Sequence, residues 1–212
     1  MKHVALSVML AGTLSLQLGC GGGGGGGSIA TCGGAFSACG GDLTGTWTFD
    51  GVCAEGDLTG QFLDVSQLPV ECGNIVKSVS MHISGTLTYA NGTETANATT
   101  SMSAHVVYSA ACIAASSGTS TTVTQAQCDA TASSYAAGSG PTATCKLASG
   151  GCDCTMSMTD NAQTTDTYTA SGGTLTYSDG SGVEYCVSGK NLTVRPPVGS
   201  GGVAMQFKLH RT

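Results

Sequence analysis

The chain has 212 residues, of which 7 are Lys or Arg and 13 are Asp or Glu, and its formal net charge at pH 7 is −6. The basic residues are few and scattered, which excludes the basic patch that nucleic-acid binding requires. Only 9% of the residues are charged, yet apolar residues alternate regularly along the chain, and this pattern is typical of a folded domain rather than of disorder.

Residues 1–19 have the pattern of a secretory leader. Lys2 and His3 precede an apolar run that ends at Leu18 and is too short and too interrupted to span a bilayer. The sequence Leu-Gln-Leu-Gly-Cys at residues 16–20 resembles the lipobox of bacterial lipoproteins, with Gln17 in place of the usual Leu. This resemblance implies that Cys20 becomes the lipidated first residue of the mature protein. The alternative is an ordinary signal peptide that is cut elsewhere.

Seven glycines follow Cys20 at positions 21–27. Glycine has no side chain to pack, so we expect a flexible tether that spans on the order of 15 Å. Gly21, rather than Asp, follows the anchor cysteine, which in enterobacterial lipoproteins implies the outer membrane. We therefore interpret residues 20–44 as a lipid anchor, a tether and a cysteine-pinned lead-in, and residues 45–212 as one exported domain.

The cysteine count favours an oxidising compartment. The chain has 11 Cys, and assigning Cys20 to a lipid leaves ten, an even number that five disulfides would use completely. Their connectivity is open at this stage, and Cys152 and Cys154 have two options, namely partners on neighbouring strands or Cys145. The ten cysteines are Cys32, Cys39, Cys53, Cys72, Cys112, Cys128, Cys145, Cys152, Cys154 and Cys186.

The first predicted strand covers residues 45–49, and residues 58–68 are either a short helix or a loop. The clearest strands lie at residues 77–89 and 98–108, where apolar and polar residues alternate. Asn91-Gly92 between them is a strong signal for a hairpin turn. If these two residues form the turn, position i pairs with position 183 minus i, which places Met81 opposite Met102 and brings both apolar faces to the same side.

Shorter alternating runs follow, separated by turn residues such as Asp179-Gly180, and no segment after residue 75 has a convincing helical period. Regularly spaced short strands with turn signals between them are typical of antiparallel barrels and sandwiches. The sequence therefore predicts an all-β fold, an antiparallel up-and-down barrel or sandwich of about eight to ten strands that is stapled by disulfides. The later runs cover residues 152–158, 164–170, 174–177, 183–188, 192–195 and 203–209.

The two ends of the predicted domain resemble a lipocalin, one of the calycin β-barrels. Gly45-Thr46-Trp47 opens the first strand, and Arg211 continues the apolar stripe of the last strand in phase. In lipocalins an Arg near the last strand packs across this Trp, which implies a structural pair of Trp47 and Arg211 here. The leader, the glycine tether and the segment before Trp47 also resemble uncharacterised, cysteine-rich lipoproteins of myxobacteria.

Two groups of residues suggest metal binding at first sight. His82 and His105 lie on the polar face of the predicted hairpin, but its register separates them by four residues, roughly 13 Å, which is too far for one ion. Cys152 and Cys154 flank Asp153 in a zinc-like spacing, but cysteines of exported chains are used as disulfides. We therefore predict no metal site and no cofactor.

The sequence also selects no catalytic residue. It lacks the Gly-x-Ser-x-Gly motif of serine hydrolases. Several carboxylates are spaced like solvated residues of turns and strands, and no two of them stand out as a glycosidase pair. These carboxylates are Asp153, Asp160, Asp166, Asp179 and Glu184.

Three classes of function are consistent with these features. The first is a lipid-anchored envelope protein whose barrel binds a small apolar ligand, because apolar stripes rich in Met, Tyr and Ala leave room inside a barrel. The second is a structural or interaction lipoprotein whose Thr and Ser face meets other envelope components. The third, least favoured, is an enzyme. In each case we expect contact with the membrane through the lipid on Cys20 and no nucleic-acid partner, and the oligomeric state is left open.

Overall fold

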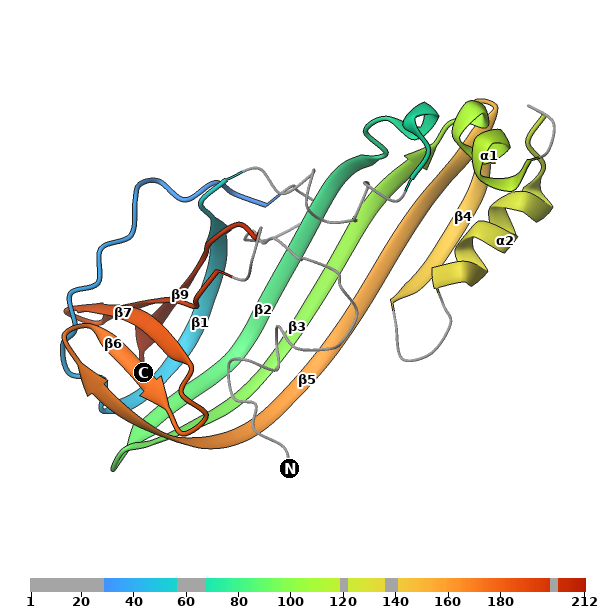
Figure 1. Ribbon diagram of the computed structural model, residues 1–212. Coiled ribbons are helices and arrows are strands. Elements are labelled where there is room, and N and C mark those ends of the chain that lie inside the picture. Colours follow the sequence, from blue (N-terminus) through green and yellow to red (C-terminus); the bar gives the residue numbers. More distant parts are fainter. Residues whose placement is uncertain (1–28, 57–67, 119–121, 136–140, 199–201) are drawn as a thin grey trace.

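The computed structural model describes residues 29–56, 68–118, 122–135, 141–198 and 202–212 (Figure 1). The predictions for Cys20, for the leader and tether, and for most of residues 58–68 lie outside these ranges. The described residues form nine strands, two α-helices (α1, Ala110–Ser117, and α2, Gln125–Tyr135) and a short 3-10 helix, Val70–Cys72. The strands are β1 (Gly45–Ala54), β2 (Val76–Ala90), β3 (Thr93–Tyr108), β4 (Thr142–Ala148), β5 (Gly151–Ser171), β6 (Thr174–Tyr177), β7 (Gly182–Ser188), β8 (Asn191–Arg195) and β9 (Met205–Arg211).

The strands form a closed antiparallel ring. Their order in the sheet is β3-β2-β1-β9-β8-β7-β6-β5-β4, and β3 also pairs with β5, which closes the ring. With β4 set aside, the other strands follow one another around the ring in chain order, because β3 is followed directly by β5. The all-β prediction is confirmed, and of its two forms the structure is the up-and-down barrel.

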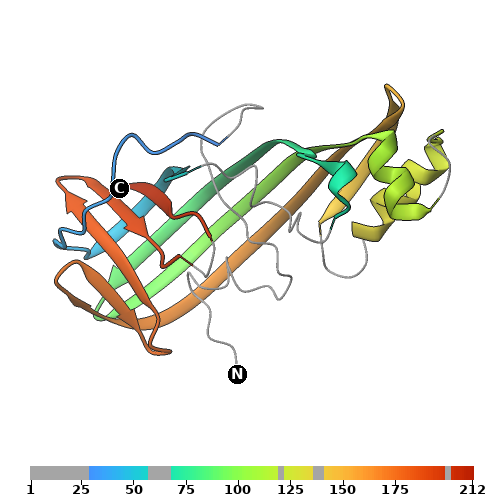
Figure 2. The same cartoon turned by 45° about the horizontal axis from the view of Figure 1, so that its top comes forward.

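The strands differ greatly in length, so the barrel is extended on one side. β2, β3 and β5 have 15, 16 and 21 residues, whereas β6 has 4 and β8 has 5. Figures 1 and 2 show the long strands rising well beyond the short ones, with β4, α1 and α2 at their far end. We call this extension, formed by β4 and by the parts of β2, β3 and β5 beyond the short strands, the arm.

The β2–β3 hairpin has the predicted register. Met81 lies opposite Met102, and His82 lies opposite Ser101. Asn91 and Gly92 form the turn and both have positive φ angles, 53° and 72°, as a two-residue hairpin turn of the primed type requires. Because residues two apart share a face, this register brings the apolar side chains of both strands to the inside.

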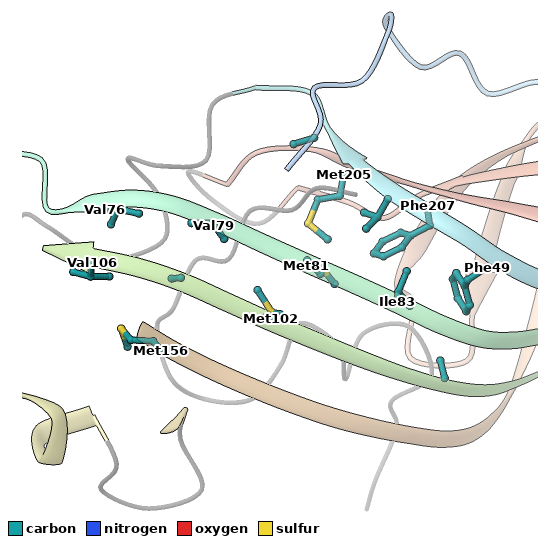
Figure 3. Packing of buried hydrophobic residues seen from close by; sticks show 14 of the residues in the cluster. Phe49, Val76, Val79, Met81, Ile83, Met102, Val106, Met156, Met205 and Phe207 are labelled. Carbon is teal, nitrogen blue, oxygen red and sulfur yellow. The ribbon is translucent and has the colours of Figure 1, made fainter. Parts of the chain in front are cut away.

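The core lies on the inner face of this curved sheet. Figure 3 shows Met205 and Phe207 of β9 pointing toward β2, and Met81 of β2 lying beside Met102 of β3. All four side chains are buried and belong to one hydrophobic cluster. Thioether side chains are flexible and polarizable, so they fill irregular apolar spaces well.

The sequence showed no convincing helical period after residue 75, and the expectation of no helix there is wrong, because α1 and α2 both follow it. α1 begins after Ser109, whose side chain accepts a hydrogen bond from the Cys112 amide, and it ends at Gly118 in the left-handed conformation. Before α2, the amide and hydroxyl of Thr124 both donate to Oε1 of Gln127. Both helices are short and only weakly amphipathic, so they leave little periodic signal in the sequence.

The runs at residues 152–158 and 164–170, predicted as separate strands, belong to the single strand β5. Its polar middle reads Thr-Asp-Asn-Ala-Gln at residues 159–163 and looks like a loop in the sequence. β3 pairs with it without interruption, from Tyr108 opposite Cys152 to Thr93 opposite Thr167. Backbone pairing with β3, rather than local preference, makes this segment a strand.

The described cysteines form five disulfides, so the prediction of a disulfide-stapled domain is confirmed. Two of these disulfides tie the segment before β1 to the barrel, and three lie toward the tip of the arm, where α1, α2, β4 and the start of β5 meet (Figure 1). Cys154 takes the Cys145 option, and Cys152 pairs with a helix cysteine instead. The pairs are Cys32–Cys53, Cys39–Cys186, Cys72–Cys112, Cys128–Cys152 and Cys145–Cys154.

Candidate functional site

A carboxyl group lies inside the barrel, where apolar side chains dominate. Glu94, near the start of β3, has 0% of its surface exposed. Tyr89 of β2 is its direct neighbour across the hairpin, and the hydroxyl of Tyr177 on β6 donates a hydrogen bond of 2.6 Å to Oε2 of Glu94. We call these three residues the Glu94 cluster.

The carboxyl of Glu94 is surrounded by the two tyrosines of the cluster. Oε1 of Glu94 and the hydroxyl of Tyr89 are both buried, and hydrogen bonding to Tyr177 and to Tyr89 acts on the pKa of Glu94. Buried polar atoms in native proteins nearly always have a hydrogen-bond partner. The two phenols therefore supply the polar contacts of this carboxyl inside the barrel.

Burial dominates the electrostatics of this cluster. It raises the pKa of Glu94, because the charged form loses water. The hydrogen bonds with Tyr177 and Tyr89 oppose this effect, and the nearby Asp166 adds to it. Burial likewise raises the pKa of Tyr89 and of Tyr177, so both phenols keep their protons. As a protonated phenol, Tyr177 serves as a hydrogen-bond donor to Glu94.

Small side chains continue the inner wall beyond the Glu94 cluster. On β3, Ala96 and Ala98 follow Glu94 on the same face, and they lie opposite Thr164 and Ala162 of β5. Farther along, the pair of Met102 and Met158 marks the start of the methionine-lined part. The wall thus changes from polar side chains to small ones and then to flexible apolar ones.

Trp47 and Arg211 come together where the first and last strands pair. They are direct partners across β1 and β9, and the guanidinium carbon of Arg211 lies over the Trp47 ring. The indole Nε1 donates a 2.7 Å hydrogen bond to the carbonyl oxygen of Leu43, and Nη2 of Arg211 donates to the carbonyl oxygen of Asp42. The pair therefore joins the lead-in segment to both strands.

The two hairpin histidines are separate. His82 and His105 lie opposite Ser101 and Ser78, as their register predicted. Nε2 of His105 lies 2.9 Å from Oδ1 of Asp153, and both side chains are more than 40% exposed. Among the described residues, no three His, Cys, Asp or Glu side chains are grouped as a metal site would require.

The remaining carboxylates of the sequence analysis lie in different places. Asp160 and Asp166 share the inner face of β5 with Met156 and Ala162, since these positions are an even number of residues apart. Glu184 faces outward and pairs with Arg195, which also makes a two-point contact with Glu55. Asp179 lies in the turn between β6 and β7, where its Oδ1 accepts a hydrogen bond from the backbone amide of Ser181.

The sequence analysis missed the Glu94 cluster, although one signal for it was present. The alternation at residues 98–108 extends back to Thr93 in the structure, and continuing it by two steps from Ala98 places Glu94 on the inner face. Its partner Tyr177 is 83 residues away, so nothing local in the sequence indicates that the carboxyl is buried.

In comparisons with protein-family models, with curated proteins and with solved structures, the chain has no match. None of the helices within the described ranges is long and apolar enough to cross a membrane. The five disulfides are compatible with an oxidising, extracellular type of compartment.

Proposed function

We propose that this protein is a lipoprotein of the bacterial cell envelope, anchored through Cys20, whose lipocalin-like barrel holds a small apolar ligand. The observation that carries the proposal is the closed ring of strands with an apolar, methionine-rich inner face. Barrels of about eight strands are wide enough to hold one small ligand. Methionine side chains adapt to ligands of different shape, because they are flexible and polarizable.

The proposed anchor is supported by the sequence and by the disulfides. Ten of the 11 cysteines are joined in pairs among the described residues, and the remaining one, Cys20, closes the lipobox-like sequence. A lipid on Cys20, a tether of seven glycines and a disulfide-rich domain together suit a protein held at a membrane surface. The outer membrane is the proposed location, because Gly21 rather than Asp follows the cysteine.

The lipocalin-like character is supported by the Trp47–Arg211 contact. A Gly-x-Trp motif at the start of the first strand and an Arg of the last strand meet across β1 and β9. The resemblance to lipocalins implies such a contact, and a ligand inside the barrel follows from the same resemblance.

Intact mass spectrometry of the mature protein from a native-like host tests the anchor. We expect the mass of a chain lipidated at Cys20 and a gain of ten hydrogens on reduction of the five disulfides. An unlipidated mass contradicts the anchor. Organic extraction of the same material tests the ligand, since a specifically bound apolar molecule should be recovered in a ratio near one per protein. Failure to recover one, together with failure to take up an apolar fluorescent probe, contradicts it.

A second candidate function is that of a structural or interaction lipoprotein without a small-molecule ligand. The outer face of the sheet favours it, because hydroxyl side chains line up across neighbouring strands, as in the row Thr46, Thr88, Thr95 and Thr165. Such a face offers hydrogen bonds but little apolar area to a partner. Co-purification with one envelope component, without uptake of an apolar ligand, would support this alternative over the first.

A further inference from the structure

The disulfide Cys39–Cys186 is the most accessible of the five that the structure describes. Cys39 is exposed and Cys186 is half-buried, whereas each of the other four described disulfides has at least one buried cysteine. A thiolate must reach a sulfur atom before it breaks the bond, so the rate of thiol–disulfide exchange depends on access. We therefore expect a thiol in solution to react first at this disulfide.

The same disulfide holds one short segment against the barrel. Residues 38–43, which we call the strap, run past the turn between β5 and β6 and along β7 before the chain enters β1 (Figure 1). The amides of Cys39 and Gly40 both donate to the carbonyl oxygen of Tyr185, and the amide of Val187 donates to the carbonyl oxygen of Gly40. Backbone hydrogen bonds and one covalent bond thus hold the strap on β7.

The strap ends beside the only Trp of the chain. Leu43 is buried, and its carbonyl oxygen accepts a 2.7 Å hydrogen bond from Nε1 of Trp47. Gly41 packs so closely on β7 that a Cβ there would lie 2.8 Å from Cβ of Val187. Because of this close fit, the place of the strap on β7 also determines how Leu43 meets Trp47.

We propose that Cys39 is a site of reversible thiol exchange, at which a small thiol is attached and the strap is released from β7. The thiolate of the small thiol attacks Sγ of Cys39, which is the exposed end of the disulfide. A new disulfide forms between these two sulfur atoms, the bond between Cys39 and Cys186 breaks, and its electron pair leaves with Sγ of Cys186.

The exchange is balanced without any other oxidant or reductant. The sulfur of the small thiol is oxidised, the sulfur of Cys186 is reduced, and Cys186 takes up a proton in place of the one that the small thiol lost. The reaction is reversible, because the Cys186 thiol stays on β7 and attacks Cys39 again when the strap returns. The inference goes beyond the proposed function and is independent of it, since it involves no ligand inside the barrel.

Glutathione serves as the probe. The protein is the full chain with Cys20→Ser and its five disulfides formed, so that no thiol of the chain competes. The folded protein is exposed to glutathione at about pH 8, where part of the probe is thiolate; the reaction is stopped with acid, and free thiols are trapped with N-ethylmaleimide before peptide mapping by mass spectrometry. We expect glutathione on Cys39 and the maleimide on Cys186, at least about tenfold faster than either label at any other cysteine.

Several results of the mapping would contradict the inference. Labels that appear first at another disulfide, or at all five together, would show that access does not select Cys39–Cys186. Glutathione on Cys186 with the maleimide on Cys39 would contradict the direction of attack. A complete lack of adduct, while a small model disulfide is exchanged under the same conditions, would show that the site is closed. The mapping uses the native set of disulfides, so it does not depend on whether a disulfide variant folds.

The fluorescence of Trp47 then tests the release of the strap. Trp47 is fully buried, and quenching by acrylamide should become at least about twofold stronger once Leu43 leaves the indole. We expect this rise in the glutathionylated protein and in the variant Cys39→Ser/Cys186→Ser, with circular dichroism unchanged.

Cys145→Ser/Cys154→Ser is the matched control. This disulfide is buried in the arm and joins residues only 9 apart, so its loss should leave the quenching of Trp47 unchanged. Equal quenching of the parent and the glutathionylated protein would show that the strap stays on β7, and an equal rise in the control would show a general loosening of the fold. Either result would contradict the release.

Discussion

The guanidinium carbon of Arg211 lies 4.5 Å from the centre of the Trp47 ring, and the two residues are partners across β9 and β1. Trp47 is fully buried, and its only polar atom donates to the carbonyl oxygen of Leu43. Arg211 therefore covers the indole from the end of the barrel, at the place where strands from opposite ends of the domain meet.

Arg211→Ala should destabilise the fold. The change removes the cation–π contact and the hydrogen bond to the Asp42 carbonyl oxygen, and we expect a loss of about 1–3 kcal/mol in the free energy of unfolding. Denaturant unfolding with the disulfides intact measures it. Lys208→Ala, an exposed position on the same strand, should change stability by less than about 0.5 kcal/mol. Equal effects of the two substitutions would show that the contact with Trp47 contributes nothing.

Gly85→Ala should destabilise the β2–β3 hairpin severely. Gly85 has a φ of +111°, and a Cβ there would overlap the carbonyl oxygen of Asn97 on β3. We expect a loss of more than about 3 kcal/mol, measured as a drop in the thermal midpoint. Gly180→Ala is the control, because Gly180 also has a positive φ but open space around it, and its loss should be about 1–2 kcal/mol. Similar losses at both positions would mean that the backbone of β3 shifts to make room for the new side chain.

Glu94 should make the fold less stable as the pH rises. Burial raises its pKa above the ordinary value of 4.5, so between these two values the folded state binds a proton that the unfolded state has lost. Stability contributed by the protonated carboxyl is complete below the ordinary pKa and is lost as the pH rises through the raised pKa. Glu94→Gln removes this loss.

The corresponding measurement compares Glu94→Gln with the parent chain by denaturant unfolding at about pH 4 and about pH 7. We expect nearly equal stability at the acidic pH and a more stable variant at neutral pH. Glu71→Gln, at an exposed glutamate, is the control for the loss of one carboxyl group. A Glu94→Gln variant that is less stable than the parent at neutral pH would contradict the expected sign.

The disulfides should differ in their contribution according to the loop that each one closes. Cys39–Cys186 joins residues 147 apart in the sequence, whereas Cys145–Cys154 joins residues 9 apart. In the chain-entropy model the first contributes about 5 kcal/mol and the second about 2.5 kcal/mol. Paired Cys→Ala variants compared by denaturant unfolding measure the difference. The reverse order would mean that native packing at the arm, rather than loop entropy, decides the stability there.

Arg195→Lys should destabilise the fold, because it removes ionic hydrogen bonds on the outer face near the end of β8. The guanidinium makes two contacts with Glu55 and one with Glu184, and a single ammonium cannot reproduce this fork. We expect a loss of about 1–2 kcal/mol by thermal or denaturant unfolding. Lys190→Arg, which changes an exposed cation in the β7–β8 turn, should be neutral. An unchanged stability for Arg195→Lys would show that one of the contacts suffices.

The sequence was a good guide wherever the signal is local. The period-2 alternation and the Asn91-Gly92 turn predicted the β2–β3 register residue by residue, because a hairpin is specified by its turn and its two faces. The sequence was a poor guide wherever distant contacts decide. α2 has a Thr124–Gln127 cap, but Cys128–Cys152 and packing on β4 hold it in place.

The same distinction applies to the candidate site. The sequence indicated exposed residues such as His82 and His105 as the visible candidates, because His is conspicuous in a Thr-rich chain. The Glu94 cluster depends instead on Tyr177, which only the closure of the barrel brings to β3. A buried carboxyl is identified by its surroundings, and these are assembled from strands far apart in the sequence.

The pairing of β1 with β9 also constrains how the protein matures. β1 begins at Gly45 and β9 ends at Arg211, so the barrel cannot close until nearly the whole domain has been synthesised and, if it is exported, translocated. Until then the edges of β1 and β8 are open, and unpaired edges bind other strands. Protection of these edges during folding, by a chaperone or by early formation of Cys39–Cys186, would therefore favour the native protein over pairing with other chains.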